Sequence, residues 1–183
     1  MINLKFFLDL FRHKCYNESK RNSGGGMYME MFGEVDSVDF AIYLNKIAKK
    51  RGLDVNVTKI QKWLYICYGV YITVSGDQLL TERPKAWNFG PAFPSVHKLQ
   101  KKNNDSLDGL EGSINDIEKL KKYDSIINST LDTFGNWSAT QLVDWTHEED
   151  TAWDKRLKDN DMYSNIHNQD IINDFRKIVD YEY

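Results

Sequence analysis

The sequence predicts a mainly α-helical protein, built as a compact orthogonal bundle of helices around one central helix. Apolar residues recur at helical spacing through most of residues 36–180. Glycines stand at the ends of several of these periodic segments, and strand-like patterns are limited to short stretches at residues 78–80 and 85–87. We therefore expect a helical core with at most a small β-hairpin, close to the Trp-x-x-Gly-Pro sequence at residues 87–91.

Two helices are expected at the start of the periodic region. The first follows Asp36 and ends in a basic turn before Gly52. The second carries a broad apolar face, and we take it as the central helix. Thr58 and Gln61 have the spacing of a capping box, so we expect this helix to begin there. Gly69 inside it costs about 1 kcal/mol relative to alanine, so we expect another element to pack closely against it.

Further helices are predicted after the Trp-x-x-Gly-Pro sequence. Pro94 suits the first turn of a helix, and one longer helix is expected over residues 115–134. Ser138 and Gln141 repeat the capping-box spacing ahead of the next helix. The remaining expected helices are a short one around Trp153 and a last one over residues 171–179.

Residues 86–94, with the sequence AWNFGPAFP, form the most informative segment of the chain. This segment places three aromatic residues, two prolines and one glycine where a regular helix cannot form. Pro91 and Pro94 fix their own backbone angles and restrict the residues before them, and Gly90 can take a positive φ where the chain turns. A loop this stiff can dock another protein, line a pocket or fill the protein's own core, and the sequence leaves these alternatives open.

The composition limits the class of partner. The 183 residues include 24 Lys and Arg against 27 Asp and Glu, a net charge of −3, so nucleic-acid binding is not expected. No apolar run approaches the roughly 20 residues that span a bilayer, so no membrane partner is expected. Cys15 and Cys67 stand far apart and match neither a paired nor a zinc spacing, which favours a reducing, cytoplasmic setting.

Residues 1–33 are predicted to be an N-terminal extension, and residues 34–183 a single helical domain. The extension begins with a short amphipathic pattern and contains a Gly-rich linker at residues 24–26. An upstream-start extension, with translation beginning at Met27, Met29 or Met31, a mobile arm and a lid are the alternatives, and we expect a dispensable tail.

His147 is the strongest candidate for chemistry, because three acidic residues at positions 148–150 follow it directly. A small hydrolase or ligand-binding protein that uses His147 and these carboxylates is therefore one hypothesis. Adjacent residues diverge on a helix or turn, however, and no second metal ligand stands one helical turn away. Cys67 lies on the apolar face of the central helix and is expected to pack as a small hydrophobe. We expect a structural His147, no catalytic residue, no metal and no cofactor.

Several short segments occur together in a distinctive order. They are TKIQKWLY at residues 58–65, GDQLL at 76–80, the 86–94 segment, WSATQL at 137–142, Thr-His at 146–147 and Ala-Trp at 152–153. In this combination the chain resembles, over about residues 36–180, the Panacea domain family of SocA-like antitoxins and GepA-like phage-associated proteins. The family usually has Tyr before Gly-Pro and Val-Val or Val-Ile after it, whereas this chain has Phe89 and Ala92-Phe93.

The resemblance implies an antitoxin that binds and neutralises a toxin encoded by a neighbouring gene. The expected partners are the cognate toxin and, by the resemblance, a protease or chaperone to which the toxin is presented. A cytoplasmic location and association with a prophage are also implied. Trp and other large aromatic residues dominate binding hot spots, which favours the stiff loop and the Thr-His and Ala-Trp motifs as contact points. The candidate partner-binding residues are Trp87, Phe89, Gly90, Pro91, Phe93, Pro94, His147 and Trp153.

Overall fold

One long central helix organises the fold, as the sequence predicts. The computed structural model describes residue 33 and residues 35–179. This part of the chain is mainly helical with one two-stranded antiparallel sheet, which confirms the predicted fold class. Its elements in chain order are α2 (Ser37–Lys50), α3 (Val57–Ser75), β1 (Lys85–Trp87), β2 (Gly90–Ala92), α4 (Pro94–Lys102), the short 3-10 helix η1 (Glu111–Ser113), α5 (Ile117–Lys121), α6 (Asp124–Phe134), α7 (Ala139–Thr146), α8 (Ala152–Lys158) and α9 (Asn168–Val179).

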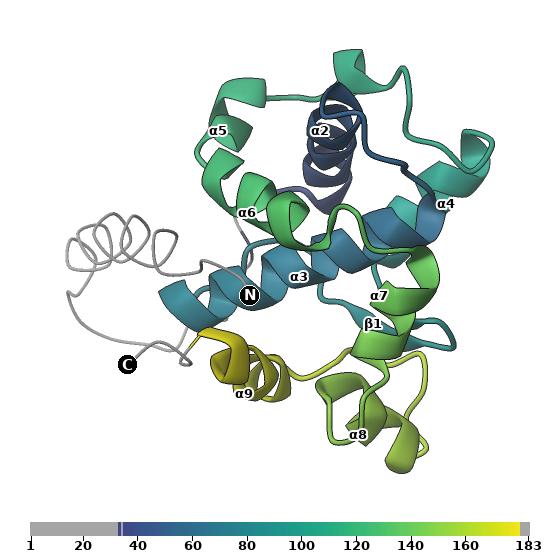
Figure 1. Cartoon of the computed structure of the whole chain (residues 1–183), viewed down its shortest axis with the longest axis vertical. Helices are drawn as coiled ribbons and strands as arrows, with labels where there is room; N and C mark the ends of the chain where they lie inside the picture. The colour runs from purple at the N-terminus through teal and green to yellow at the C-terminus, as the bar shows by residue number, and fades with distance from the viewer. Residues whose placement is uncertain (1–32, 34, 180–183) are drawn as a thin grey trace.

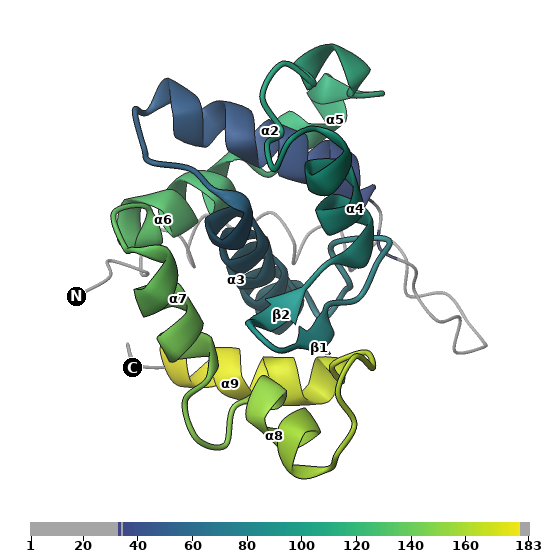
Figure 2. The same cartoon turned by 90° about the vertical axis from the view of Figure 1, so that its right-hand side faces the viewer.

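Helix α3 lies at the centre and packs against α2, α4, α6, α7, α9 and strand β2. In Figure 1, α2, α5 and α6 lie on one side of α3, and α8 and α9 lie on the other. Figure 2 shows the β1–β2 hairpin at one side of α3, between α4 and α9. Because α3 has neighbours on several sides, its apolar face is broad, as the sequence indicates.

The N-termini of α2 and α3 are fixed by side-chain caps. The carboxylate of Asp36 caps α2 by accepting hydrogen bonds from two backbone amides of the first turn. The cap of α3 lies two residues earlier than predicted, because the side chain of Asn56 caps this helix by accepting from the amide of Lys59. The predicted capping box of Thr58 and Gln61 is wrong: the Gln61 amide is buried and bonds elsewhere.

Gly69 allows α9 to lie close to α3. A Cβ atom built on Gly69 would stand 2.2 Å from a ring carbon of Phe175, a buried residue of α9. The same phenylalanine ring packs edge-on against Tyr65, with 5.6 Å between the ring centroids. The close approach predicted at Gly69 is therefore confirmed.

The single helix predicted over residues 115–134 is wrong, because the chain forms two helices, α5 and α6, with a turn between them. Tyr123 stands at this turn and is buried. Its ring contacts Phe40 and Tyr71 edge-on, with 5.7 Å between the centroids in each case. The turn places this ring between the two others, and such aromatic contacts add to the free energy of burial.

Strands β1 and β2 form the small hairpin that the sequence predicts. Gly90 has a φ of +91°, a conformation that glycine adopts without strain. On the outer side of β1, the Ala86 amide donates to the Ser164 carbonyl at 3.0 Å, and the Ala86 carbonyl accepts from the Tyr163 amide at 2.8 Å. The hairpin is thereby joined to the segment between α8 and α9. Its register pairs Lys85 with Ala92, Ala86 with Pro91 and Trp87 with Gly90.

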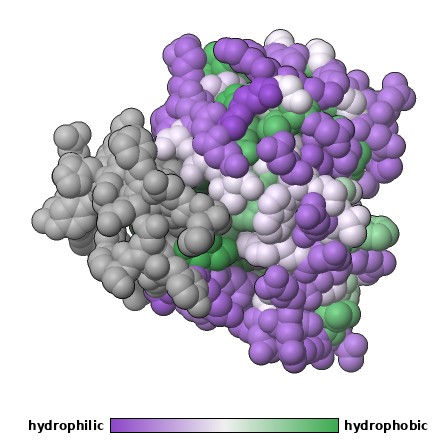
Figure 3. Space-filling view, in the orientation of Figure 1, coloured by the Kyte–Doolittle hydropathy of each residue, from purple (hydrophilic) through white to green (hydrophobic). Residues whose placement is uncertain are grey.

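The face of the molecule that Figure 1 presents is mostly polar in its described part. Figure 3 shows hydrophilic residues over most of the face seen in Figure 1, with hydrophobic residues in small separate areas. None of the helices in the described residues has both the length and the apolar character needed to cross a membrane. Residues 1–32 lie outside the described part of the chain, so the division into an extension (1–33) and a domain (34–183) stays a prediction.

Candidate functional site

The predicted binding loop is largely built into the core but exposes one large side chain. Phe89, in the turn of the hairpin, has 76% of its surface exposed, whereas Phe93 is completely buried. The segment therefore both fills the core and presents a surface, two of the roles that the sequence leaves open. The other predicted loop residues are half-buried, namely Trp87 and Pro94, or buried, namely Gly90 and Pro91.

Two side chains from different helices hold the hairpin in place. The Lys62 ammonium on α3 donates to the Pro91 carbonyl oxygen at 3.0 Å. The Trp153 indole Nε1 on α8 donates to the Trp87 carbonyl oxygen at 2.8 Å. Since each strand of the hairpin is bonded to a separate helix, its turn is presented on a fixed backbone.

Gln61 makes a third connection. Its Oε1 accepts from the backbone amide of Phe93 at 2.7 Å, and its Nε2 donates to Oε1 of Gln100 at 3.1 Å. Both glutamines are buried, so these bonds satisfy polar groups inside the core. They join α3 to α4 and to the end of the hairpin.

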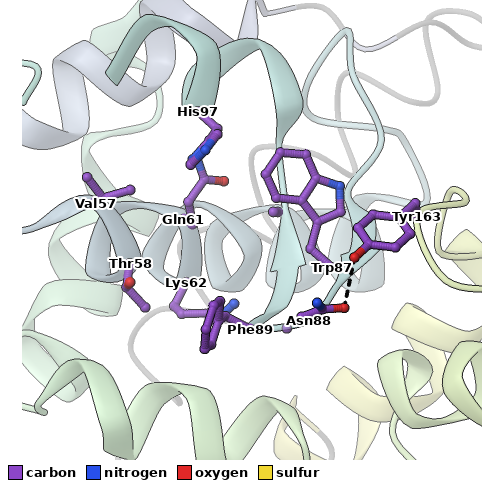
Figure 4. Close-up of a pocket in the computed structure, with 11 residues that line it drawn as sticks. Val57, Thr58, Gln61, Lys62, Trp87, Asn88, Phe89, His97 and Tyr163 are labelled. Atoms are coloured by element: carbon purple, nitrogen blue, oxygen red, sulfur yellow. Dashed lines mark hydrogen bonds between the residues drawn. The ribbon is translucent and has the colours of Figure 1, made fainter. Parts of the chain in front are cut away.

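A cavity of about 290 Å³ lies beside Phe89, between the first half of α3, the hairpin and α4. Figure 4 shows the 11 residues that line it, most of which contribute apolar surface. The Trp87 ring stands edge-on to His97, with 5.0 Å between the centroids. The Tyr163 hydroxyl donates to the Asn88 side-chain oxygen at 3.0 Å, the bond drawn in Figure 4.

Lys62 is the one lysine among the residues that line the cavity, and these residues include neither Asp nor Glu. Its side chain is only 2% exposed, and burial lowers its pKa to about 7. Within the described residues, the Pro91 carbonyl is the one hydrogen-bond acceptor that this ammonium contacts. A Cβ on Gly90 would stand 2.6 Å from the Lys62 Nζ, so the hairpin backbone closes directly over the charge.

Sequence reasoning missed Lys62 and Tyr163 as members of a site. Lys62 stands four residues before Ile66 and seven before Gly69, and this spacing places it on a buried face of α3. The spacing could therefore have shown from the sequence that Lys62 is buried. Tyr163 reaches the cavity only because its segment pairs with β1, which no local pattern indicates.

His147 does not face the acidic residues that follow it. Its ring stacks on Trp153, with 3.7 Å between the centroids and 8° between the planes. Its Nε2 is buried and has no hydrogen-bond partner in the described chain, while residues 148–150 are exposed. Burial, and secondly the charge of Lys62, lower the pKa of His147. The geometry thus gives no support to the hydrolase hypothesis, which requires a carboxylate to orient the imidazole.

The described residues give no support to two other kinds of site, a metal site and a reactive cysteine. No group of three or more His, Cys, Asp and Glu side chains in the described chain is placed to hold a metal ion. Cys67 is fully buried, with its Sγ 3.4 Å from the Thr130 hydroxyl oxygen. Burial raises the pKa of this thiol to about 12, so it stays protonated and packs as a small hydrophobe.

Comparison with known proteins agrees with the motifs in the sequence. The family model described as "Antitoxin SocA-like, Panacea domain" matches residues 60–154, just over half of the chain, and this stretch includes Lys62 and the whole hairpin. Antitoxin SocA of Caulobacter vibrioides (strain NA1000 / CB15N) is 29% identical over 132 residues, which cover 64% of this chain and 70% of that protein. No solved structure gives a significant match. On the family match, the chain belongs to the SocA-like Panacea domain family.

Proposed function

We propose that this protein is an antitoxin that binds the toxin made from a neighbouring gene and neutralises it by direct contact. Membership of the SocA-like family supports an antitoxin role, and therefore a toxin partner. A cytoplasmic complex and a prophage setting are parts of the same proposal. No enzymatic activity is proposed, because antitoxin action of this kind requires binding alone.

The exposure of Phe89 is the observation that carries the proposal. An aromatic side chain that is 76% exposed, on a hairpin fastened to two helices, is ready to be buried by a partner at little cost in ordering. Tyr163 is 56% exposed and lines the same cavity as Phe89. We call the surface formed by Phe89, Tyr163 and this cavity the hairpin face, and we assign the toxin contact to it.

The eight predicted contact residues divide into two groups on this proposal. Phe89 and the half-buried Trp87 belong to the hairpin face and contact the partner. The others support the loop from inside or from its edges, because they are buried or half-buried, and His147 stacks on Trp153. The supporting residues are Gly90, Pro91, Phe93, Pro94, His147 and Trp153.

Growth and co-purification test the proposal. The adjacent gene, induced alone, is expected to halt growth of a bacterial host, and co-expression of the native chain is expected to restore it. Phe89→Ala is expected to weaken the complex by about tenfold or more without lowering thermal stability. Leu157→Ala removes an exposed side chain that does not line the cavity and is the matched control, with native binding expected. A harmless neighbouring gene, or equal losses in the two variants, would reject the proposal.

The fate of the toxin distinguishes direct inhibition from presentation to a protease. If this chain blocks the toxin sterically, the half-life of the toxin in cells is expected to stay the same or lengthen when the two are co-expressed. A shortened half-life that depends on the native chain would instead identify an adapter, with a protease or chaperone as the second partner.

A further inference from the structure

The Lys62 ammonium is a buried charge that lacks a counter-ion within the described residues. It donates to the Pro91 carbonyl, and no carboxylate of the described chain contributes to its electrostatic environment. An ammonium group has three N–H donors. A buried charge is costly unless it is both paired and hydrogen-bonded, so this group favours a ligand that supplies acceptors and negative charge.

The cavity beside Lys62 has the size and lining for such a ligand. At about 290 Å³ it is at or below the lower end of the range for small-molecule sites, and it suits a single side chain. Its lining includes no Asp or Glu, so nothing in it repels a carboxylate. Trp87 and Phe89 offer aromatic rings on which the methylene groups of a side chain can pack.

We infer that the cavity receives an aspartate or glutamate side chain of the bound toxin, with its carboxylate paired to the Lys62 ammonium. This inference rests on the proposed function, because it names the group that the partner inserts at the hairpin face. Charge complementarity selects an acidic side chain. An apolar occupant would leave the ammonium without a counter-ion, and a basic one would place two positive charges together.

A small carboxylic acid tests the cavity without the toxin. The probe is 3-phenylpropionate, a carboxylate on an apolar stem, and its amide, 3-phenylpropionamide, is the uncharged control. In NMR titrations of the full chain, the acid is expected to bind at least about tenfold more tightly than the amide, with shifts centred on Trp87, Phe89 and Tyr163. Lys62→Met is expected to bind both probes equally. Equal binding by the native chain, or a preference for the acid that survives in Lys62→Met, would overturn the inference.

The pH dependence of the native chain provides a second readout that does not require the variant to fold. The other titratable groups near Lys62 and the cavity are His147 on α7, His97 on α4 and Tyr163. Burial and the charge of Lys62 lower the pKa of His147, so this imidazole is mainly neutral between about pH 7 and about pH 9. Over this range, affinity for the acid is expected to fall at least about fivefold as Lys62 loses its proton, while affinity for the amide stays constant. A parallel fall for both probes would contradict the inference.

The toxin assay separates this inference from the proposed function. If the neighbouring gene product does not bind the chain, the antitoxin proposal fails. If it binds the native chain and Lys62→Met equally, the pairing of Lys62 fails while the antitoxin proposal stands. Binding of 3-phenylpropionate that does not compete with the toxin would identify a free carboxylic acid as the occupant and would likewise overturn the inference.

Discussion

The indole of Trp153 donates a 2.8 Å hydrogen bond to the backbone carbonyl oxygen of Trp87, 66 residues earlier in the chain. Trp153 is only 6% exposed, and its ring also stacks on His147 at the end of α7. One side chain of α8 thus connects the end of α7 to strand β1. The position of the hairpin face therefore depends on the C-terminal helices.

Replacing Trp153 by Phe is expected to lower the free energy of unfolding by about 1 to 3 kcal/mol, because the substitution leaves a carbonyl of the hairpin without its donor. Chemical denaturation measures the loss, and hydrogen exchange at the Tyr163 amide, which bonds to β1, reports loosening of the hairpin. Trp137→Phe is the matched control, since Trp137 is half-buried and contacts Phe134 through its ring. Equal losses in the two variants would show that the indole bond contributes nothing specific.

Gly69→Ala is expected to lower the free energy of unfolding by about 2 kcal/mol, despite the better helix propensity of alanine. The added methyl group would stand 2.2 Å from the Phe175 ring, so α3 and α9 must move apart. Gly112→Ala provides the control, because no atom lies within 4 Å of the corresponding position. Thermal melting of both variants checks this prediction, and a native melting temperature for Gly69→Ala would contradict it.

Gly90→Ala is expected to be more damaging than Gly109→Ala, although both glycines have a positive φ, of +91° and +79°. At Gly109 a Cβ meets nothing within 4 Å, so the cost is backbone strain of about 1 to 2 kcal/mol. At Gly90 it would also stand 2.6 Å from the Lys62 Nζ and 2.6 Å from the Thr146 hydroxyl oxygen. We expect an added loss of about 2 kcal/mol in denaturant unfolding, together with weaker toxin binding. Similar losses at the two positions would argue against a tight contact over Lys62.

The burial of Lys62 makes stability depend on pH in a defined direction. Its pKa is lowered from 10.5 to about 7 in the folded chain, so the unfolded chain binds more protons between these two values. Stability is therefore expected to rise as the pH rises above about 7, by an amount on the order of 4 kcal/mol if the whole interval is spanned. The useful window is about pH 7 to about pH 9, because burial raises the pKa of Cys67 and of Tyr65, and these groups oppose the trend at higher pH.

Lys62→Met is expected to remove this slope. At about pH 7 it is also expected to be more stable than the native chain, because the relief of the buried charge exceeds the loss of about 1 to 3 kcal/mol that results when the Pro91 carbonyl has no donor. Denaturant unfolding at several pH values measures both effects. A slope that persists in the variant would mean that another group carries the pH dependence.

Local patterns were sufficient to predict most of the helices and the small hairpin, because each depends on residues near one another in the chain. The close approach at Gly69 was predicted from the glycine alone, although its neighbour Phe175 belongs to α9 and is distant in sequence. The cap of α3 was predicted two positions late, since Asn56 and Thr58 both have side chains able to cap a helix and only packing decides which one does. The break between α5 and α6 was missed because Tyr123 turns the chain to meet Phe40, which is distant in sequence.

The candidate site was only partly predictable for the same reason. Phe89 was identified because a stiff aromatic loop is visible in the sequence, but the burial of Phe93 and the exposure of Phe89 depend on how the hairpin is fastened. The position of the Lys62 ammonium depends on its hydrogen bond to the carbonyl of Pro91, 29 residues away. No local pattern shows which lysine on the buried face of a helix will bond to a neutral acceptor and which will pair with a carboxylate.

The bonding along both edges of the hairpin limits how a partner can use it. The outward-facing amide and carbonyl of Ala86 are already paired with Ser164 and Tyr163, and Pro91 has no amide while its carbonyl is held by Lys62. Neither edge thus offers the free backbone groups on which an incoming strand could add itself to the sheet. On the proposed function, recognition at this surface accordingly proceeds through side chains, and changes in them can alter partner choice while the backbone scaffold stays the same.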